Sequence, residues 1–310
     1  MIKVGFIGLG NMGMPMALNL HKSKKIDLLG YDVSQKTTQK FKSKKAKATN
    51  SLTELINFSD IIISCVPGPN QIKALSVGKN KIIDQLDKNK VWIDCSTNSL
   101  SCFNFLKKKL KRKINQFVDA TISGGNLKAQ SGDLSIFVGG QKKTVNKLKF
   151  IFNILGKNLY YLNTAGAGYA AKIAQVSLCY LNYLSLSESL MLGVKSGIKP
   201  RTMLEIIDKS ASGGYTSTRY GPNMINGDYD PSFFLGLSMK DLNLANEIIK
   251  LEKLNLPIMN LTSKIYKQAI KKFGPNSNHL KVIKLLEQNN KLTFSKEGRW
   301  KIISAKQIGK

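Results

Sequence analysis

Residues 4–20 read VGFIGLGNMGMPMALNL and combine an apolar run, a glycine-rich turn and the start of a helical pattern. Gly8, Gly10 and Gly13 follow the apolar run with the spacing G-x-G-x-x-G. In a strand–turn–helix unit, such glycines allow a tight turn, close approach of the backbone to a pyrophosphate, and close packing of helix on strand. The sequence therefore predicts a dinucleotide-binding loop at a helix N-terminus. The predicted loop consists of Gly8, Leu9, Gly10, Asn11, Met12 and Gly13.

An acidic residue ends the second apolar run, LLGYD at 28–32. Asp32 lies 19 residues after Gly13, which is about where a carboxylate accepts hydrogen bonds from the adenosine ribose of a dinucleotide. A negative charge there repels the 2′-phosphate of NADP, so NAD is the predicted cofactor. Lys36 adds a cation nearby and leaves NADP as an open alternative.

Short β-branched runs alternate with helix-length polar segments from residue 1 to residue 163. The predicted strands are residues 2–7, 27–32, 60–66, 90–95, 116–120, 134–139 and 158–162. The early runs are apolar throughout, as in parallel strands covered on both faces. The last two runs are expected to form an antiparallel extension. This pattern predicts an α/β Rossmann-type domain.

Helical periodicity replaces this alternation after residue 164. The predicted helices are residues 166–196, 200–209, 239–255, 258–273 and 279–290. The chain is therefore expected to contain a Rossmann-type dinucleotide-binding domain at 1–163, followed by an all-α domain at 164–292 that completes the site. Residues 293–310 are expected to be a tail.

The four cysteines, Cys65, Cys95, Cys102 and Cys179, form no C-x-x-C pair and have no zinc-ligand spacing, so no metal site is predicted. Scattered cysteines of this kind are typical of buried thiols in a reducing compartment. The chain starts with a strand-like run where a signal peptide would lie, and it lacks an apolar stretch of about 18 residues. A cytoplasmic protein without a membrane segment is expected.

A formal net charge of +29 raises the alternative of nucleic-acid binding. Lysines, however, occur in almost every segment, and the densest cluster, KKKLKRK at 107–113, contains no interleaved aromatic residue. Such an even spread is typical of solvated faces. No specific contact with nucleic acid is expected.

A dinucleotide-dependent dehydrogenase needs a group that takes the hydroxyl proton as hydride leaves the substrate. His21 and His279 lie away from the strand-end loops and are expected to be solvated surface residues. Lys172 stands near the start of the apolar helix 166–196, where burial and the positive helix end would both lower its pKa. It is the candidate base. The alternative is a lysine whose ammonium group snorkels to water.

Four motifs follow one another along residues 1–290. They are GLGNMGMPMALNL at 8–20, DATISGG at 119–125 with AQSGDLSIFVGG after it, GAGYAAK at 166–172, and KDLNLA at 240–245. The set resembles the β-hydroxyacid dehydrogenase family, whose motifs are GxGxMGxxMAxNL, DAPVSGG, GxGxxxK and KDLxLA. This family includes 3-hydroxyisobutyrate dehydrogenase and tartronate semialdehyde reductase.

The resemblance implies a role for each matching position. Ser123, Gly124 and Gly125 would bind the substrate carboxylate, and consecutive N–H groups beside a hydroxyl also favour an anion-binding nest. Lys172 would be the general acid and base. The further cofactor-binding residues implied by the family are Val66, Pro67, Thr97 and Lys240.

Two positions depart from the family pattern. Thr121 replaces a proline, with an expected loss of rigidity, and Val176 replaces an asparagine that helps to hold the substrate. Gln175 shares the helix face of Lys172 and is the candidate substitute for substrate binding. The identity of the hydroxy acid therefore stays open.

The sequence predicts an NAD-dependent enzyme that oxidises a small 3-hydroxy acid, similar to 3-hydroxyisobutyrate, to a semialdehyde or keto acid. One alternative is a reductase of a small semialdehyde such as tartronate semialdehyde. An alternative from another class is a non-catalytic nucleotide-binding scaffold that contacts nucleic acid through lysines. The long helical second domain suggests a homo-oligomer.

Overall fold

The computed structural model describes residues 1–227, 229 and 233–294. The chain divides into two compact units, Met1–Lys172 and Ile173–Lys310. The first unit thus extends beyond residue 163, the predicted domain boundary, to include the first six residues of a long helix. Nearly all of the predicted tail at 293–310 lies outside the described residues.

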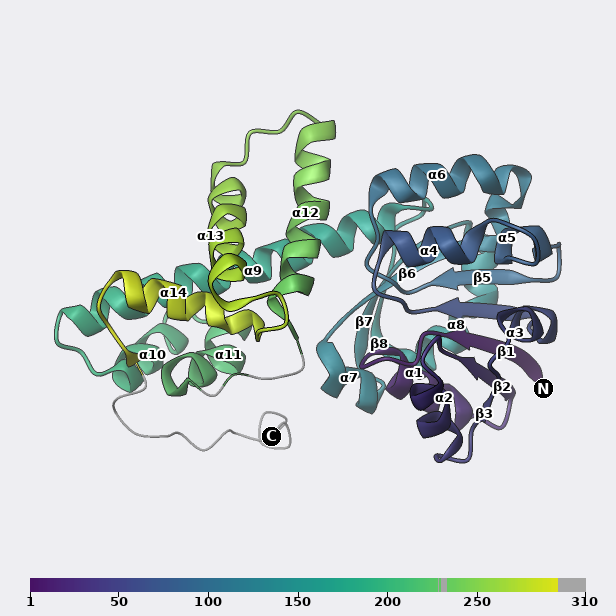
Figure 1. Cartoon of the computed structure of the whole chain (residues 1–310), viewed down its shortest axis with the longest axis horizontal. Helices are drawn as coiled ribbons and strands as arrows, with labels where there is room; N and C mark the ends of the chain where they lie inside the picture. Colours follow the sequence, from purple (N-terminus) through teal and green to yellow (C-terminus); the bar gives the residue numbers. More distant parts are fainter. Residues whose placement is uncertain (228, 230–232, 295–310) are drawn as a thin grey trace. The chain divides into compact units, whose positions relative to one another are not determined.

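The first unit is built on an eight-stranded sheet with the strand order β3-β2-β1-β4-β5-β6-β7-β8 (Figure 1). The strands are β1 (Ile2–Ile7), β2 (Ile26–Tyr31), β3 (Lys47–Ala48), β4 (Ile61–Ser64), β5 (Val91–Asp94), β6 (Phe117–Ser123), β7 (Leu134–Gly139) and β8 (Gly156–Tyr161). Strands β1 to β6 run parallel, whereas β7 pairs antiparallel with β6 and parallel with β8. The Rossmann-type class and the antiparallel extension are confirmed. The two-residue strand β3 was too short to predict from periodicity.

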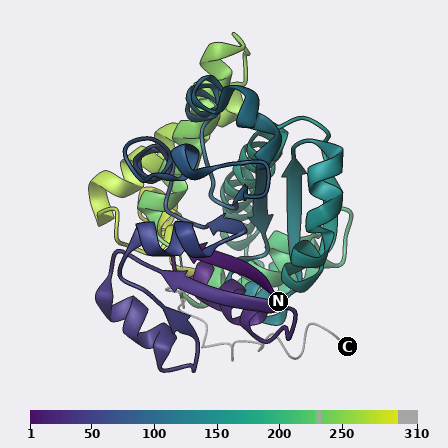
Figure 2. The ribbon, with the colours of Figure 1, turned by 90° about the vertical axis from the view of Figure 1, so that its right-hand side faces the viewer.

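In strands β1, β2, β4, β5 and β6, apolar side chains divide between two apolar layers, one on each face of the sheet. In β4, Ile61 and Ile63 belong to one buried cluster and Ile62 to the other. In β5, Ile93 and Trp92 divide between the same two clusters. Helices pack on the sheet in both views (Figures 1 and 2). This double coverage explains why the strands are apolar throughout.

Helices connect the strands of the first unit. They are α1 (Gly13–His21), α2 (Gln35–Lys42), α3 (Leu52–Phe58), α4 (Pro69–Ser76), α5 (Ile82–Gln85), α6 (Leu100–Leu110), the 3₁₀ helix η1 (Lys111–Gln116), α7 (Gly125–Ser131) and α8 (Lys142–Leu155). Serine caps several of them: the hydroxyl oxygens of Ser34, Ser51 and Ser99 accept N–H groups of the first turn of α2, α3 and α6. The start of each of these three helices is therefore marked by a capping serine in the local sequence.

The described part of the second unit is helical apart from an isolated β-bridge between Phe234 and Asn278. Its elements are the remainder of α9 (Ala167–Lys195), α10 (Pro200–Asp208), α11 (Tyr215–Asn226), α12 (Leu235–Leu251), α13 (Pro257–Phe273), the 3₁₀ helix η2 (His279–Lys281) and α14 (Val282–Asn289). The predicted all-α class is confirmed. Among the described residues, no helix combines the length and the apolar composition needed to cross a membrane.

Helix α11 was missed by periodicity, and α12 starts earlier than predicted. The α11 sequence YTSTRYGPNMIN is mostly polar and contains Pro222, so its apolar stripe is reduced mainly to Met224 and Ile225, which join the core. Its signal is local: the Ser217 hydroxyl accepts the Gly214 N–H at 3.0 Å. A capping contact, rather than a hydrophobic pattern, marks this helix.

His279 is buried, so its prediction as a solvated surface residue was wrong. Only 3% of the residue is exposed, and its ring lies 5.2 Å from the Tyr183 ring and 5.3 Å from the Phe233 ring, centroid to centroid. The bridge between Phe234 and Asn278 places this segment against the aromatic core of the helical unit. Phe234 and Asn278 are far apart in the sequence, so local sequence patterns do not predict that they pair.

Candidate active site

Five parallel strands, β1, β2, β4, β5 and β6, end at one edge of the sheet. β1 lies between β2 and β4, where the strand order reverses, and open α/β sheets bind ligands at such a position. Most of the predicted site residues follow these strands: the loop 8–13 after β1, Asp32 after β2, Val66 and Pro67 after β4, Thr97 after β5, and Ser123 at the end of β6.

The loop 8–13 leaves space in which a phosphate group could approach the backbone closely. A Cβ atom on Gly13 would lie 1.8 Å from the Gly8 carbonyl oxygen, so α1 packs on the turn only with glycine at this position. A Cβ atom on Gly10 would meet no atom within 4 Å, which leaves space beside the backbone. The N-cap residue of α1, Met12, makes no side-chain hydrogen bond to the helix. No cap competes with an anion here, and the loop fits the pyrophosphate of NAD(P).

Asp32 binds the glycine-rich loop in addition to its predicted contact with ribose. Its Oδ2 accepts a hydrogen bond of 2.7 Å from Leu9 N, and its Oδ1 accepts one of 2.8 Å from Ser34 N. Each carboxylate oxygen has a further lone pair that a ribose hydroxyl could use. The carboxylate therefore couples the glycine-rich loop to the end of β2.

The loops after β4 and β5 are connected to each other. Val66 N donates a hydrogen bond of 2.9 Å to Ser96 Oγ. Val66 and Thr97 are half-buried, and Pro67 is exposed. These residues therefore lie at the same carboxyl end of the sheet as the glycine-rich loop, after the neighbouring strands β4 and β5.

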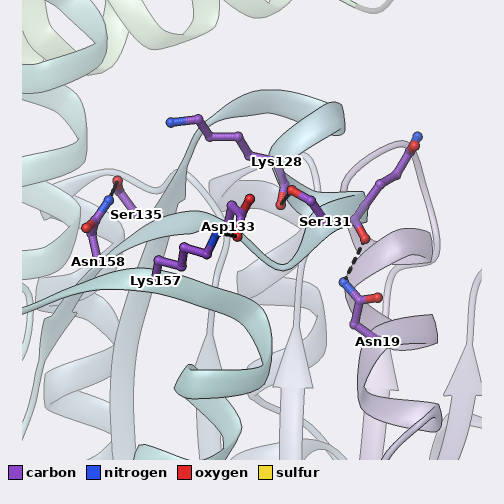
Figure 3. A network of polar contacts seen from close by, with 8 residues as sticks. Asn19, Lys128, Ser131, Asp133, Ser135, Lys157 and Asn158 are labelled. Atoms are coloured by element: carbon purple, nitrogen blue, oxygen red, sulfur yellow. Dashed lines mark hydrogen bonds and ion pairs between the residues drawn. The ribbon is translucent and has the colours of Figure 1, made fainter. Parts of the chain in front are cut away.

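The predicted carboxylate-binding residues lie where β6 passes into α7. Ser123 is half-buried, and Gly124 and Gly125 have φ angles of 135° and 71°, which favour glycine. Asn19 of α1 donates hydrogen bonds of 2.9 Å and 3.2 Å to the carbonyl oxygens of Ala129 and Gln130 in α7. Figure 3 shows the Asn19 side chain with one of these bonds as a dashed line. These bonds tie the helix that follows the turn to the helix that follows the glycine-rich loop.

A second connection joins the same two segments. Asn126, in the first turn of α7, donates from its side chain to the carbonyl oxygen of Asn11 in the glycine-rich loop. The predicted cofactor loop and the predicted substrate turn are therefore parts of one hydrogen-bonded structure.

Asp119 of β6 binds the segment that leads into α9. Its buried carboxylate accepts hydrogen bonds of 2.7 Å from Gly166 N and 3.1 Å from Tyr169 N. Burial raises the pKa of Asp119 to about 7, against the lowering effect of these backbone N–H groups. Two residues further along β6, the Thr121 hydroxyl donates to the Gly168 carbonyl oxygen at 2.7 Å.

Asp94, at the end of β5, binds the same turn through a side chain. The Tyr169 hydroxyl donates to Asp94 Oδ2 at 2.6 Å, and the Ser64 hydroxyl donates to Oδ1 at 2.8 Å. Burial raises the pKa of Asp94, and these hydrogen bonds oppose the shift. The buried Tyr169 ring packs edge-on against the Phe103 ring of α6, with centroids 6.2 Å apart.

Lys172 lies in the second turn of α9, is half-buried, and is the last residue of the first unit. Gln175 belongs to the second unit, where its Nε2 donates to Cys179 Sγ at 3.3 Å. Val176, at the position of the family asparagine, packs against the helical core.

Lys240 also belongs to the second unit and is partly exposed. Its Nζ lies 3.1 Å from Asp241 Oδ1, and the other carboxylate oxygen of Asp241 accepts a hydrogen bond of 2.8 Å from the Tyr180 hydroxyl. The lysine of the KDLNLA motif is thus paired with the acid next to it.

Several residues that shape this end of the sheet have no role predicted from the sequence. They are Asn19, Ser64, Asp94, Ser96, Asp119, Asn126 and Tyr169. A usable signal existed for Asp94 and Asp119, because each is a carboxylate within a predicted buried strand, where a charge needs partners. Asn19 had a different signal, because it is a fixed position of the motif GxGxMGxxMAxNL, whereas Asn126 has neither.

Both units match known families. Residues 3–163 match the family described as the NAD binding domain of 6-phosphogluconate dehydrogenase. Residues 166–286 match the family described as "NAD-binding of NADP-dependent 3-hydroxyisobutyrate dehydrogenase".

Related proteins align over nearly the whole chain. It is 34% identical to 2-(hydroxymethyl)glutarate dehydrogenase of Eubacterium barkeri, over 86% of this chain and 88% of that protein. It is 31% identical to 2-hydroxy-3-oxopropionate reductase of Escherichia coli K12, over 94% of this chain and 100% of that protein. The structure of Mycobacterium tuberculosis 3-hydroxyisobutyrate dehydrogenase with L-serine has the same fold, with a TM-score of 0.82 at 22% identity, over 92% of this chain and 99% of that chain.

A Rossmann sheet with a glycine-rich loop at its carboxyl edge, followed by a helical unit, defines an oxidoreductase that uses NAD(P). The chain belongs to the β-hydroxyacid dehydrogenase family.

Proposed function

We propose that the protein uses NAD to oxidise a small 3-hydroxy acid, similar to 3-hydroxyisobutyrate, to a semialdehyde or keto acid. One observation carries this proposal. The glycine-rich loop, the turn 123–125 and the start of the helix that bears Lys172 are all attached to the carboxyl edge of one sheet. A screen of small hydroxy acids with NAD and with NADP, followed by absorbance of the reduced cofactor, tests it.

In this proposal, residues 123–125 hold the substrate carboxylate. Consecutive backbone N–H groups in a turn form a concave anion site, and the Ser123 hydroxyl adds a donor beside it. Fixing the carboxylate orients the hydroxyl-bearing carbon, which lowers the entropy cost of reaching the reactive geometry.

Lys172 is the proposed general base for oxidation. Its uncharged amine accepts the proton of the substrate hydroxyl while the hydrogen on the same carbon leaves as hydride. When bound, NAD(P) supplies the acceptor for this hydride. In the opposite direction, the ammonium group returns the proton to the carbonyl oxygen.

The same residues would therefore serve a reductase of a small semialdehyde, which is the second candidate. The similarity to 2-hydroxy-3-oxopropionate reductase favours testing tartronate semialdehyde in the screen. Gln175 as a substrate contact and Lys240 as a cofactor contact remain proposals based on sequence motifs.

We also propose a homo-oligomer. Several large apolar side chains of the helical unit are exposed in the single chain, and contact with a second copy would remove their apolar area from water. They include Leu178, Leu192, Ile258 and Leu261. Light scattering would give the mass of the assembly, and a strictly monomeric mass would contradict this proposal.

Cofactor choice is tested with Asp32→Ala. The unaltered protein should show a higher kcat/KM with NAD than with NADP, and the variant should reduce that ratio by about tenfold, or about 1.4 kcal/mol. Loss of the bond to Leu9 N would weaken both cofactors alike, so the ratio isolates the contact with ribose. Asp27→Ala removes a carboxylate at the opposite end of β2 and is the matched control. Equal use of NADP by the unaltered protein contradicts NAD preference.

Substrate binding is tested with Ser123→Ala. Loss of a hydroxyl that contacts the carboxylate should raise KM by an amount equivalent to about 1 to 3 kcal/mol, whereas the Kd of NAD should stay the same. Ser135→Ala is the control, because Ser135 pairs with Ser123 across β6 and β7 and is also half-buried. A variant that loses NAD affinity but keeps its KM would show that the turn has been misassigned.

A further inference from the structure

We propose that Thr121 and Tyr169 are positioning residues that hold the first turn of α9, and with it Lys172, on the carboxyl edge of the sheet. This inference rests on the proposed role of Lys172. Neither residue has a role in the family motifs, and Thr121 stands where the family usually has proline.

Buried hydrogen bonds attach this turn to two strands. From β6, the Thr121 hydroxyl donates to Gly168 O at 2.7 Å, and Asp119 accepts Gly166 N at 2.7 Å. At the end of β5, Asp94 accepts the Tyr169 hydroxyl at 2.6 Å. Thr121, Asp119, Asp94 and Tyr169 are each 0% exposed, so water does not compete for these bonds.

The Thr121 bond acts on the carbonyl group one helical turn before the lysine. In an α-helix, the N–H of each residue bonds the carbonyl oxygen four residues earlier, so Gly168 O is the partner of Lys172 N. The Thr121 hydroxyl is a second donor to that oxygen. Proline cannot supply it, so the departure from the family pattern adds a connection where the sequence alone suggested lost rigidity.

Tyr169 attaches the same turn to the end of β5. Its ring belongs to the buried cluster that includes Trp92, Phe103 and Phe117, and its hydroxyl reaches Asp94. A side chain held at the ring by packing and at its tip by a hydrogen bond fixes both the depth and the rotation of the helix. Tyr169 precedes Lys172 by three residues, so any rotation of this turn moves the amine directly.

The turn also lies closer to β6 than a side chain at position 168 would allow. A Cβ atom on Gly168 would lie 2.7 Å from Asp119 Oδ2 and 2.5 Å from the Phe137 carbonyl oxygen. The start of α9 is therefore bound to the sheet by backbone proximity as well as by the two side-chain hydroxyls.

Such a connection should affect turnover more than binding. Proton transfer requires the base within hydrogen-bond distance of the substrate hydroxyl, and a shift of about 1 Å can cost about 100-fold in rate. The carboxylate turn and the glycine-rich loop do not depend on the two hydroxyls, so affinity for substrate and cofactor should be retained.

The experiment compares two Thr→Val variants of the full-length protein. Thr121→Val removes the bond to Gly168 O, and Thr144→Val removes a bond of equal length, 2.7 Å, from α8 to the carbonyl oxygen of Asn115 in the same unit. We expect kcat to fall by about 10- to 100-fold for Thr121→Val only, with an unchanged KM and an unchanged Kd of NAD. Thr121→Ser keeps the hydroxyl and should restore kcat.

Tyr169→Phe is the second variant, and it tests the inference even if Thr121→Val fails to fold. It keeps the ring and removes only the hydroxyl, so kcat should fall while the primary deuterium isotope effect on hydride transfer rises. A kcat as high as that of Thr144→Val in both variants would overturn the inference, and so would a loss confined to KM or Tm. If Lys172→Met removes turnover while these variants keep it, only this inference fails. If Lys172→Met keeps turnover, the proposed function fails first.

Discussion

Lys172→Met is expected to lower kcat by about 10² to 10⁴, the usual contribution of a positioned acid or base. Methionine keeps most of the length and the apolar stem but has no group that can accept a proton. NAD binding should survive, because the hydrogen bond from Leu9 N to Asp32 in the predicted cofactor site does not involve this side chain. In the unaltered protein, oxidation should speed up as pH rises, because only the uncharged amine accepts the hydroxyl proton. Rates across pH and a titration with NAD measure both effects.

Lys195→Met is the matched control for this experiment. Lys195 ends the same helix and is exposed, so the identical substitution there should leave kcat unchanged. A Lys172→Met protein that binds NAD and turns over at the original rate would show that the lysine only snorkels to water. The proposed mechanism would then be wrong.

Gly13→Ala is expected to have the largest effect on the fold. Its Cβ would lie 1.8 Å from the Gly8 carbonyl oxygen, and a backbone atom cannot move away as a flexible side chain can. The glycine-rich loop and α1 must separate, with a loss of stability of about 3 kcal/mol or more and loss of NAD binding. Thermal unfolding followed by circular dichroism measures the first effect, and a cofactor titration measures the second.

Gly10→Ala separates the two effects, because its Cβ would meet no protein atom within 4 Å. Its Tm should stay at or slightly above that of the unaltered protein, since alanine loses less backbone entropy on folding. NAD affinity should nevertheless fall by about tenfold or more, because the methyl group occupies space that a pyrophosphate needs. Unchanged NAD affinity would place the pyrophosphate elsewhere, and a stable Gly13→Ala protein would contradict the close packing of α1.

Local patterns were enough to predict most of the first unit. The strand runs in β1, β4 and β5 are apolar because helices cover both faces, and this leaves a mark that does not depend on distant residues. The spacing of Gly8, Gly10 and Gly13 is similarly local. Helix α11 was not predicted, because a mostly polar helix with an internal proline has almost no periodic pattern of apolar residues. It nevertheless buries Met224 and Ile225.

The role of Thr121 could not be predicted from local patterns. From the motif alone, replacing proline by threonine suggests a looser loop. In the fold, the threonine hydroxyl meets a carbonyl oxygen 47 residues further along the chain. No periodicity or spacing signals that contact, because its two partners meet only when α9 packs on β6.

The sequence by itself determined the α/β class, the helical second half, the glycine-rich loop and the family motif that ends at Lys172. These depend on periodicity and on short spacings, which the backbone converts directly into structure. Only the tertiary structure decided that Asp94 and Tyr169, 75 residues apart, share a hydrogen bond, and that His279 is buried among aromatic rings. Such pairings follow from the packing of whole elements, because a buried polar group needs a partner and the fold alone determines which distant residue lies within reach.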